Sequence, residues 1–155
     1  MPKLIHRIGG FVAPICIATF FLSTVLVELF GSHEAVARLK SLIVTPGLWI
    51  LIPAIAAAGS SGMFLSMSRR GRLVDAKKKR MPFIAANGLL VLVPCAIVLN
   101  RWATAGSFDT SFYVVQTVEL IAGPVNLTQL GMNLRDGLRM AGRLRVRPSP
   151  SSSIS

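Results

Sequence analysis

Acidic residues are scarce in this chain of 155 residues, which has only 6 Asp and Glu against 17 Lys and Arg. Histidine and cysteine are rarer still, at 2 each. Metal sites and nucleophilic active sites are built mostly from these residue types. Cys16 and Cys95 both lie in apolar stretches, where cysteine behaves as a small buried apolar residue. We therefore expect no metal site and no disulfide framework.

The known catalytic and nucleotide-binding patterns are also missing. The chain has no P-loop, no GxSxG and no HExxH sequence. A haem bound within the chain would need two ligands at one depth, but His6 and His33 lie on opposite sides of the first apolar stretch. A site that joins His33 to another subunit stays open. We expect no cofactor, and no catalysis by this chain alone.

The chain is instead rich in long apolar stretches. It is 52% hydrophobic, with a mean hydropathy of +0.62, which is too apolar for a soluble domain of this size. Each stretch has about the 20 residues that a helix needs to cross a bilayer. This predicts an all-α integral membrane four-helix bundle over residues 1–147 and a disordered tail over 148–155. The four predicted spans are 8–30, 42–66, 82–100 and 111–134.

A cleaved signal peptide is the alternative for the first span. Lys3 and Arg7 would be its positive region, and Ala35-Val36-Ala37 resembles a cleavage site. The apolar stretch is about 23 residues long, however, against about 7–15 for the core of a signal peptide. We therefore expect a retained helix.

The basic residues are distributed very unevenly. Of the 17 Lys and Arg, 14 lie before the first span, between spans two and three, or after span four. The positive-inside rule then places both termini in the cytoplasm, as an even number of spans requires. We expect a multi-pass protein of the plasma membrane, in a bacterium the inner membrane, and no nucleic-acid partner. The middle loop should contact anionic lipid headgroups through Arg69, Arg70, Arg72, Lys77, Lys78, Lys79 and Arg80.

Small residues in span two predict a helix packing site. Such residues let two helix backbones approach closely within a membrane. Because Gly9 and Gly10 fall at the same depth of span one, we expect the first two spans to touch there. A polar cavity lined by the two serines is the alternative. The predicted packing residues are Gly59, Ser60, Ser61 and Gly62.

A polar stripe on span four is the strongest candidate site. It consists of Gln116, Glu119, Asn126, Gln129 and Asn133, and apart from Gln116 its members share one helix face. Polar groups facing lipid are unfavourable, so the stripe should face the bundle interior or a protein partner.

Glu119, the stripe's only carboxylate, lies about 12 Å from the outer end of span four. Its candidate partners are the Trp49 indole and the carbonyls freed by Pro94. Lys40 is assigned to the outer connection 31–41, so no Lys or Arg is expected at that depth. The sequence therefore predicts no salt bridge for Glu119.

Two apolar segments also resemble each other. Gly47 and Pro53 recur as Gly88 and Pro94 at the same offset, in segments expected to cross in opposite directions. Inverted repeats of transporters have this relation, although apolar segments also match by chance.

Two functions fit these features. The first is a non-catalytic accessory or assembly subunit that packs against other membrane helices, in a homo- or hetero-oligomer. The second is a small oligomeric transporter or proton-coupled carrier that uses Glu119. A water-accessible cavity at Glu119 would favour transport, and a dry, hydrogen-bonded stripe would favour a structural role.

Overall fold

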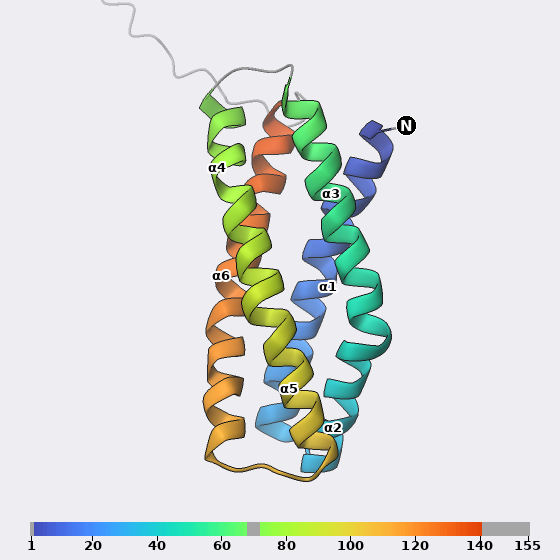
Figure 1. Cartoon of the computed structure of the whole chain (residues 1–155), viewed down its shortest axis with the longest axis vertical. Coiled ribbons are helices and arrows are strands. Elements are labelled where there is room, and N and C mark those ends of the chain that lie inside the picture. The colour runs from blue at the N-terminus through green and yellow to red at the C-terminus, as the bar shows by residue number, and fades with distance from the viewer. Residues whose placement is uncertain (1, 68–71, 141–155) are drawn as a thin grey trace, which may run out of the picture.

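The helices of this chain stand side by side along one long axis (Figure 1). The structure, a computed structural model, describes residues 2–67 and 72–140, and within them it contains helices and short connections but no strand. The all-helical class is therefore confirmed. In chain order the elements are α1 (Pro2–Phe30), α2 (His33–Leu42), η1 (Ile43–Leu48), α3 (Trp49–Met67), α4 (Arg72–Ala86), η2 (Asn87–Leu92), α5 (Val93–Thr104) and α6 (Thr110–Met140).

Helices long and apolar enough to cross a membrane account for much of the chain. Within the described residues there are 3, which run over Ile8–Phe30, His33–Gly62 and Lys79–Thr104. The first has the bounds predicted from the sequence. The described helix α6 is equally long but is not one of them, because its polar residues lower its hydropathy. The chain is thus compatible with a multi-pass membrane protein.

The second long helix begins earlier than predicted. The connection expected over 31–41 is almost entirely helical, and only Gly31 and Ser32 separate α1 from α2. The Ser32 hydroxyl accepts a hydrogen bond from the Ala35 backbone N–H at 3.3 Å, which caps the start of the helix. The helix that begins after Ser32 continues without a break into η1. This brings Lys40 into the helical assembly.

Two irregular segments, η1 and η2, interrupt the long helices. In η1 the backbone is kinked at Thr45, which has φ −137° and ψ 110° and precedes Pro46. A proline disfavours the helical conformation of the residue before it. Each segment contains one glycine of the similar sequences noted above, Gly47 or Gly88, and both glycines are buried. The two interrupted helices run in opposite directions (Figure 1).

Helix α1 shows how the apolar surface is divided. Its inward side has small or medium residues, with Ala13 and Ile17 in a buried cluster shared with Leu48 and Leu51. Its outward side exposes larger apolar side chains. This arrangement suits a helix whose outer face contacts acyl chains, because lipid tails solvate apolar groups as well as a protein core does. The exposed residues are Ile8, Phe11, Ile15, Leu22, Leu26, Leu29 and Phe30.

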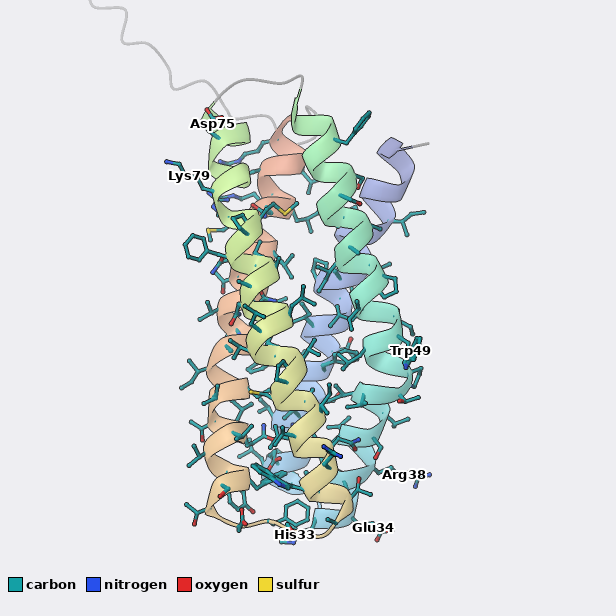
Figure 2. All side chains as sticks on the ribbon, viewed as in Figure 1. His33, Glu34, Arg38, Trp49, Asp75 and Lys79 are labelled. Carbon is teal, nitrogen blue, oxygen red and sulfur yellow. The ribbon has the colours of Figure 1, made fainter. Side chains whose placement is uncertain are left out.

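Charged side chains lie toward the two ends of the assembly (Figure 2). His33, Glu34 and Arg38 are at one end, and Asp75 and Lys79 are at the other. Trp49 points outward between them. A membrane protein is expected to show this distribution, with charge at both interfaces and apolar side chains between them.

Candidate functional site

The polar side of α6 faces the interior of the assembly. Gln116, Asn126 and Asn133 are buried, while Glu119 and Gln129 are half-buried. Positions 119, 126 and 133 are seven residues apart and therefore lie on nearly one line along the helix. The predicted stripe is thus enclosed by this chain's own helices and is not presented outward to a partner.

Glu119 forms a salt bridge with Lys40. The Lys40 Nζ lies 2.5 Å from the Glu119 Oε2, and the two side chains are only 1% and 14% exposed. The Gln116 Nε2 donates to the same carboxylate oxygen at 3.2 Å, from one turn earlier on α6. Lys40 reaches this position because it is one turn after buried Val36, on the inward side of α2. The pair therefore joins α2 to α6 inside the assembly.

The expected surroundings of Glu119 were wrong in two respects. A lysine does lie at its depth, because the segment assigned to a connection is helical and buries Lys40. Trp49 is not its partner, because the indole is 77% exposed and points away from the assembly (Figure 2). A prediction from hydropathy alone assigns lysines to the connections between spans. A lysine can nevertheless be buried within the helices when a carboxylate pairs with it. The signal that pointed to Lys40 was its four-residue spacing from Val36 in a helix capped by Ser32.

Glu28 is a second carboxylate at this site and was not singled out from the sequence. It is half-buried near the end of α1, and the charges of Lys40, Glu119 and His33 all act on it. Its Oε1 is buried and has no hydrogen-bond partner among the described residues. The Cys95 thiol on α5 also lies within the electrostatic reach of Glu119 and Lys40. Helices α1, α2, α5 and α6 thus all contribute to one cluster.

A cavity of about 60 Å³ adjoins this cluster. Its polar wall is formed by Thr24, Glu119 and Asn126, and the rest of the wall is mainly apolar, with Phe20 and Leu51 among its residues. One water molecule needs about 10–15 Å³ of such space, so the cavity has room for a few. It extends from Glu119 to Asn126, which are about 10 Å apart along α6.

Two buried amides of α6 are not satisfied by the protein. Asn126 is fully buried, and neither its Nδ2 nor its Oδ1 has a hydrogen-bond partner among the described residues. The same holds for Asn133, which is 5% exposed. A buried amide without partners costs about 1–3 kcal/mol, so such groups tend to have a role that repays this cost. The stripe is therefore hydrogen-bonded at Gln116 and Glu119, whereas Asn126 and Asn133 have no partner among the described residues.

The other end of α6 has an ion pair of its own. The Arg80 Nη1 of α4 donates to the Asp136 Oδ2 at 2.7 Å, and the Arg135 Nε lies 3.6 Å from Oδ1. Burial raises the pKa of the Asp136 carboxyl, but the hydrogen bond and charge of Arg80, together with Arg135, outweigh burial and hold the pKa below its ordinary value. Asp136 was not predicted, because it lies beyond the apolar stretch that drew attention to α6.

A close contact between α1 and α3 involves Gly9, one of the two glycines at which the first two spans were expected to touch. A Cβ built on Gly9 would lie 2.8 Å from the Ala54 carbonyl oxygen and 3.0 Å from the Ala58 backbone nitrogen, so α1 and α3 do touch closely. A Cβ on Gly59 would meet nothing within 4 Å. Of its neighbours, Ser60 is exposed, Ser61 is buried and Gly62 is half-buried. Both serine hydroxyls donate to α3 backbone carbonyls, and neither serine lines the cavity.

The basic residues of the middle loop are only partly described. Arg69 and Arg70 lie outside the described residues, as does the predicted tail 148–155. Arg72, Lys77 and Lys78 lie on α4. Lys79 is exposed at the end of the assembly (Figure 2), whereas Arg80 is paired with Asp136.

Aromatic rings close the end of the assembly near the Glu119 site. The His33 imidazole stacks on Phe108 with ring centroids 4.2 Å apart, and Phe108 makes an edge contact with Phe112 at 4.9 Å. Phe112 is fully buried against Leu99. The connection between α5 and α6, residues 105–109, is thereby packed onto α2, α5 and α6.

Comparisons of the chain with protein-family models, with curated proteins and with solved structures found no match.

Proposed function

We propose that this chain is a four-span protein of the plasma membrane, in bacteria the inner membrane, with α6 as its fourth span. The support is the direction of the polar side of α6. A helix that turns its amides and carboxylate inward can present an apolar surface to lipid, although its average hydropathy is low. Val114, Val118, Ile121 and Val125 are exposed on its outer side.

The proposed orientation has both termini in the cytoplasm. The start of α4 and the end of α6, which includes Arg135 and Arg139, belong to the same end of the assembly (Figure 1). The positive-inside rule assigns this end to the cytoplasm. Lys79 and its neighbours would contact anionic headgroups there, each for about 1 kcal/mol. The Lys40–Glu119 pair would then lie closer to the outer surface.

The proposed activity is that of a small proton-coupled carrier in which Glu119 is the titrating group. The observation that carries the proposal is a buried polar column inside the chain. It runs from Gln116 through Glu119 and Asn126 to Asn133, about 25 Å along α6, against a hydrocarbon core about 30 Å thick. A cavity connects its charged part to its unpartnered amide. Ionisable residues at this depth commonly belong to proton relays.

The accessory or assembly subunit, which the sequence placed first, is the second candidate here. Its support is the set of apolar outer faces, which include Trp49, Ile50, Phe64 and Phe83. These faces suit neighbouring helices and lipid alike. The stripe itself offers a partner nothing, because its polar groups face inward. The geometry therefore favours the carrier, for which oligomerisation with further copies would enlarge the small enclosed volume.

Proton flux into lipid vesicles tests the proposed activity. Purified protein is reconstituted with a pH-sensitive dye inside, and a potassium diffusion potential drives proton entry. We expect protein-dependent acidification that is lost in Glu119→Gln, because an amide does not titrate near neutral pH. Glu34→Gln, at an exposed position near the same end, is the matched control and should keep the wild-type rate. A wild-type rate equal to that of protein-free vesicles would reject the carrier.

A further inference from the structure

Lys40 interacts electrostatically with two carboxylates, Glu119 and Glu28. It is bonded to Glu119, and its charge also acts on Glu28, whose Oε1 has no hydrogen-bond partner among the described residues. If all three groups are ionised, one buried ammonium faces two carboxylates and the cluster has a net negative charge. An unpaired ion is strongly disfavoured in a low-dielectric interior. A single bound proton removes this charge.

We propose that Glu28, Lys40 and Glu119 form a site that binds one shared proton, and that Lys40 pairs with whichever carboxylate lacks it. The inference rests on the carrier function for its role in transport, and it assigns the place of the transported proton. In the structure Glu119 has two donors, Lys40 and Gln116. Glu28 is therefore the proton-bearing group of this arrangement.

The second arrangement exchanges the partners. The O–H bond of Glu28 breaks, an O–H bond forms at Glu119, and Lys40 moves to Glu28 with its three protons unchanged. The flexible four-carbon stem of lysine allows its ammonium to change partners. Because Glu119 lines the cavity, the proton then faces the cavity and Asn126. The net charge of the cluster is zero in both arrangements, so the exchange involves no unpaired ion.

Three other groups lie around the cluster. His33 of α2 is exposed at the end of the assembly, with its ring stacked on Phe108, and is not counted in the buried cluster. Cys95 of α5 is a neutral thiol near Glu119 and Lys40. Gln116 of α6 is an uncharged donor. The remaining carboxylate side chains are elsewhere: Glu34, Asp75 and Asp109 are exposed, and Asp136 is paired with Arg80.

Infrared spectroscopy of the full chain in lipid vesicles tests the shared proton, because a protonated carboxyl has a carbonyl stretch that shifts in heavy water. At neutral pH we expect one such carboxyl in the wild type. Glu28→Gln and Glu119→Gln should each have none, because one carboxylate then pairs fully with Lys40. Lys40→Met should double the band, because two carboxylates then lack a cation. Glu34→Gln is the control and should match the wild type.

The variants distinguish a proton shared by Glu28 and Glu119 from a proton held by Glu28 alone. If burial alone protonated Glu28, the band would persist in Glu119→Gln, and this outcome overturns the shared proton. A wild type without the band overturns it as well. If Lys40→Met does not fold, the wild type and the two isosteric Gln variants decide the matter by themselves. The expected band pattern without any proton flux would retain the shared proton and reject the carrier function.

Discussion

At the scale of single residues, the Lys40–Glu119 pair is the feature that most needs an explanation. Removing two charges from water is costly, and an apolar pair of similar volume is often as stable as a buried salt bridge. The 1% exposure of Lys40 makes this cost considerable. Stability therefore gives no sufficient reason for such a pair, whereas a titrating role does. The neighbouring carboxylate of Glu28 strengthens this view, since a purely structural pair needs no second acid.

Two replacements of Glu119 show how much its hydrogen-bonding end contributes to stability, because Gln keeps that end and Leu does not. We expect Glu119→Leu to be less stable than Glu119→Gln by about 1–3 kcal/mol, because Leu leaves the Gln116 amide, which donates to Glu119, without this acceptor. The Gln side chain keeps the shape and one acceptor oxygen. Thermal unfolding in detergent measures the difference. Equal stability of the two variants would mean that the hydrogen bond accepted at position 119 contributes nothing to the fold.

The residues of this site were predictable to different degrees. Glu119 and the amides of α6 stood out because polar groups are rare in an apolar stretch, and their periodicity placed them on one face. Lys40 and Glu28 did not stand out, because each lies near the end of an apolar stretch, where charge is ordinary. Only the three-dimensional arrangement shows that they turn inward. A sequence pattern reports the face of a helix but not the neighbour that the face meets.

At the scale of elements, α6 contributes to two ion pairs, which lie toward opposite ends of the helix. It pairs with α2 through Glu119 and with α4 through Asp136. Between them, Asn126 packs against Gly88 of η2, and the Asn87 side chain of η2 donates to the Ala122 carbonyl at 2.9 Å. The helix is irregular both around Gly47, where it is kinked at Thr45, and around Gly88, so the two similar sequences share an interruption of the regular helix.

The contact between α4 and α6 should weaken in acid. The pKa of Asp136 is lowered in the folded chain, so its contribution is fully present above the unfolded value of about 3.9 and is lost as the pH falls through the folded value. Asp136→Asn should cost about 1.5–3 kcal/mol at neutral pH, as expected for a hydrogen bond to a charged group. Unfolding in detergent between neutral and acidic pH measures both effects. A variant that keeps the full acid sensitivity of the wild type would assign it to other carboxylates.

The contact between α1 and α3 depends on Gly9. We expect Gly9→Leu to destabilise the fold, because even a Cβ would lie 2.8 Å from the Ala54 carbonyl oxygen. Gly10→Leu is the matched control, since a Cβ at Gly10 meets nothing within 4 Å. Thermal stability in detergent should fall by about 1–3 kcal/mol for the first variant, as for overpacking of a tight contact, and should barely change for the second. A similar loss in both would place the close approach elsewhere.

Gly59 carries a separate prediction about assembly. Its open surroundings leave it available to another copy or another membrane protein. We expect Gly59→Leu to leave the stability of the single chain unchanged and to lower the oligomer fraction, because a bulky side chain separates helix backbones. Crosslinking in native membranes measures the oligomer. An unchanged oligomer would assign the Gly59 face to lipid.

At the scale of the whole molecule, the apolar stretches and the uneven basic charge determine the proposed topology. The first predicted stretch, 8–30, lies within α1 and ends where α1 ends, because an uninterrupted apolar run between polar flanks marks a helix clearly. The second predicted stretch began too late, at residue 42. The polar residues of α2 lower the local hydropathy, although this helix is buried on one side. For α6 the proposal depends on which way its polar side faces, and no hydropathy average contains that information.

Cysteine labelling of intact cells tests the proposed topology of the whole chain. A cysteine at position 76, on α4 near the most basic segment, should resist a membrane-impermeant reagent and react only after the cells are permeabilised, because the positive-inside rule places this end in the cytoplasm. Ser107→Cys, in the exposed connection before α6, is the matched control and should react in intact cells. Both are made with Cys16 and Cys95 replaced by Ala, so that the introduced thiol alone is labelled. The opposite labelling pattern would invert the orientation and place the Lys40–Glu119 site toward the cytoplasm. Labelling of both positions from the same side would contradict an odd number of crossings between them, and with it the span over Lys79–Thr104.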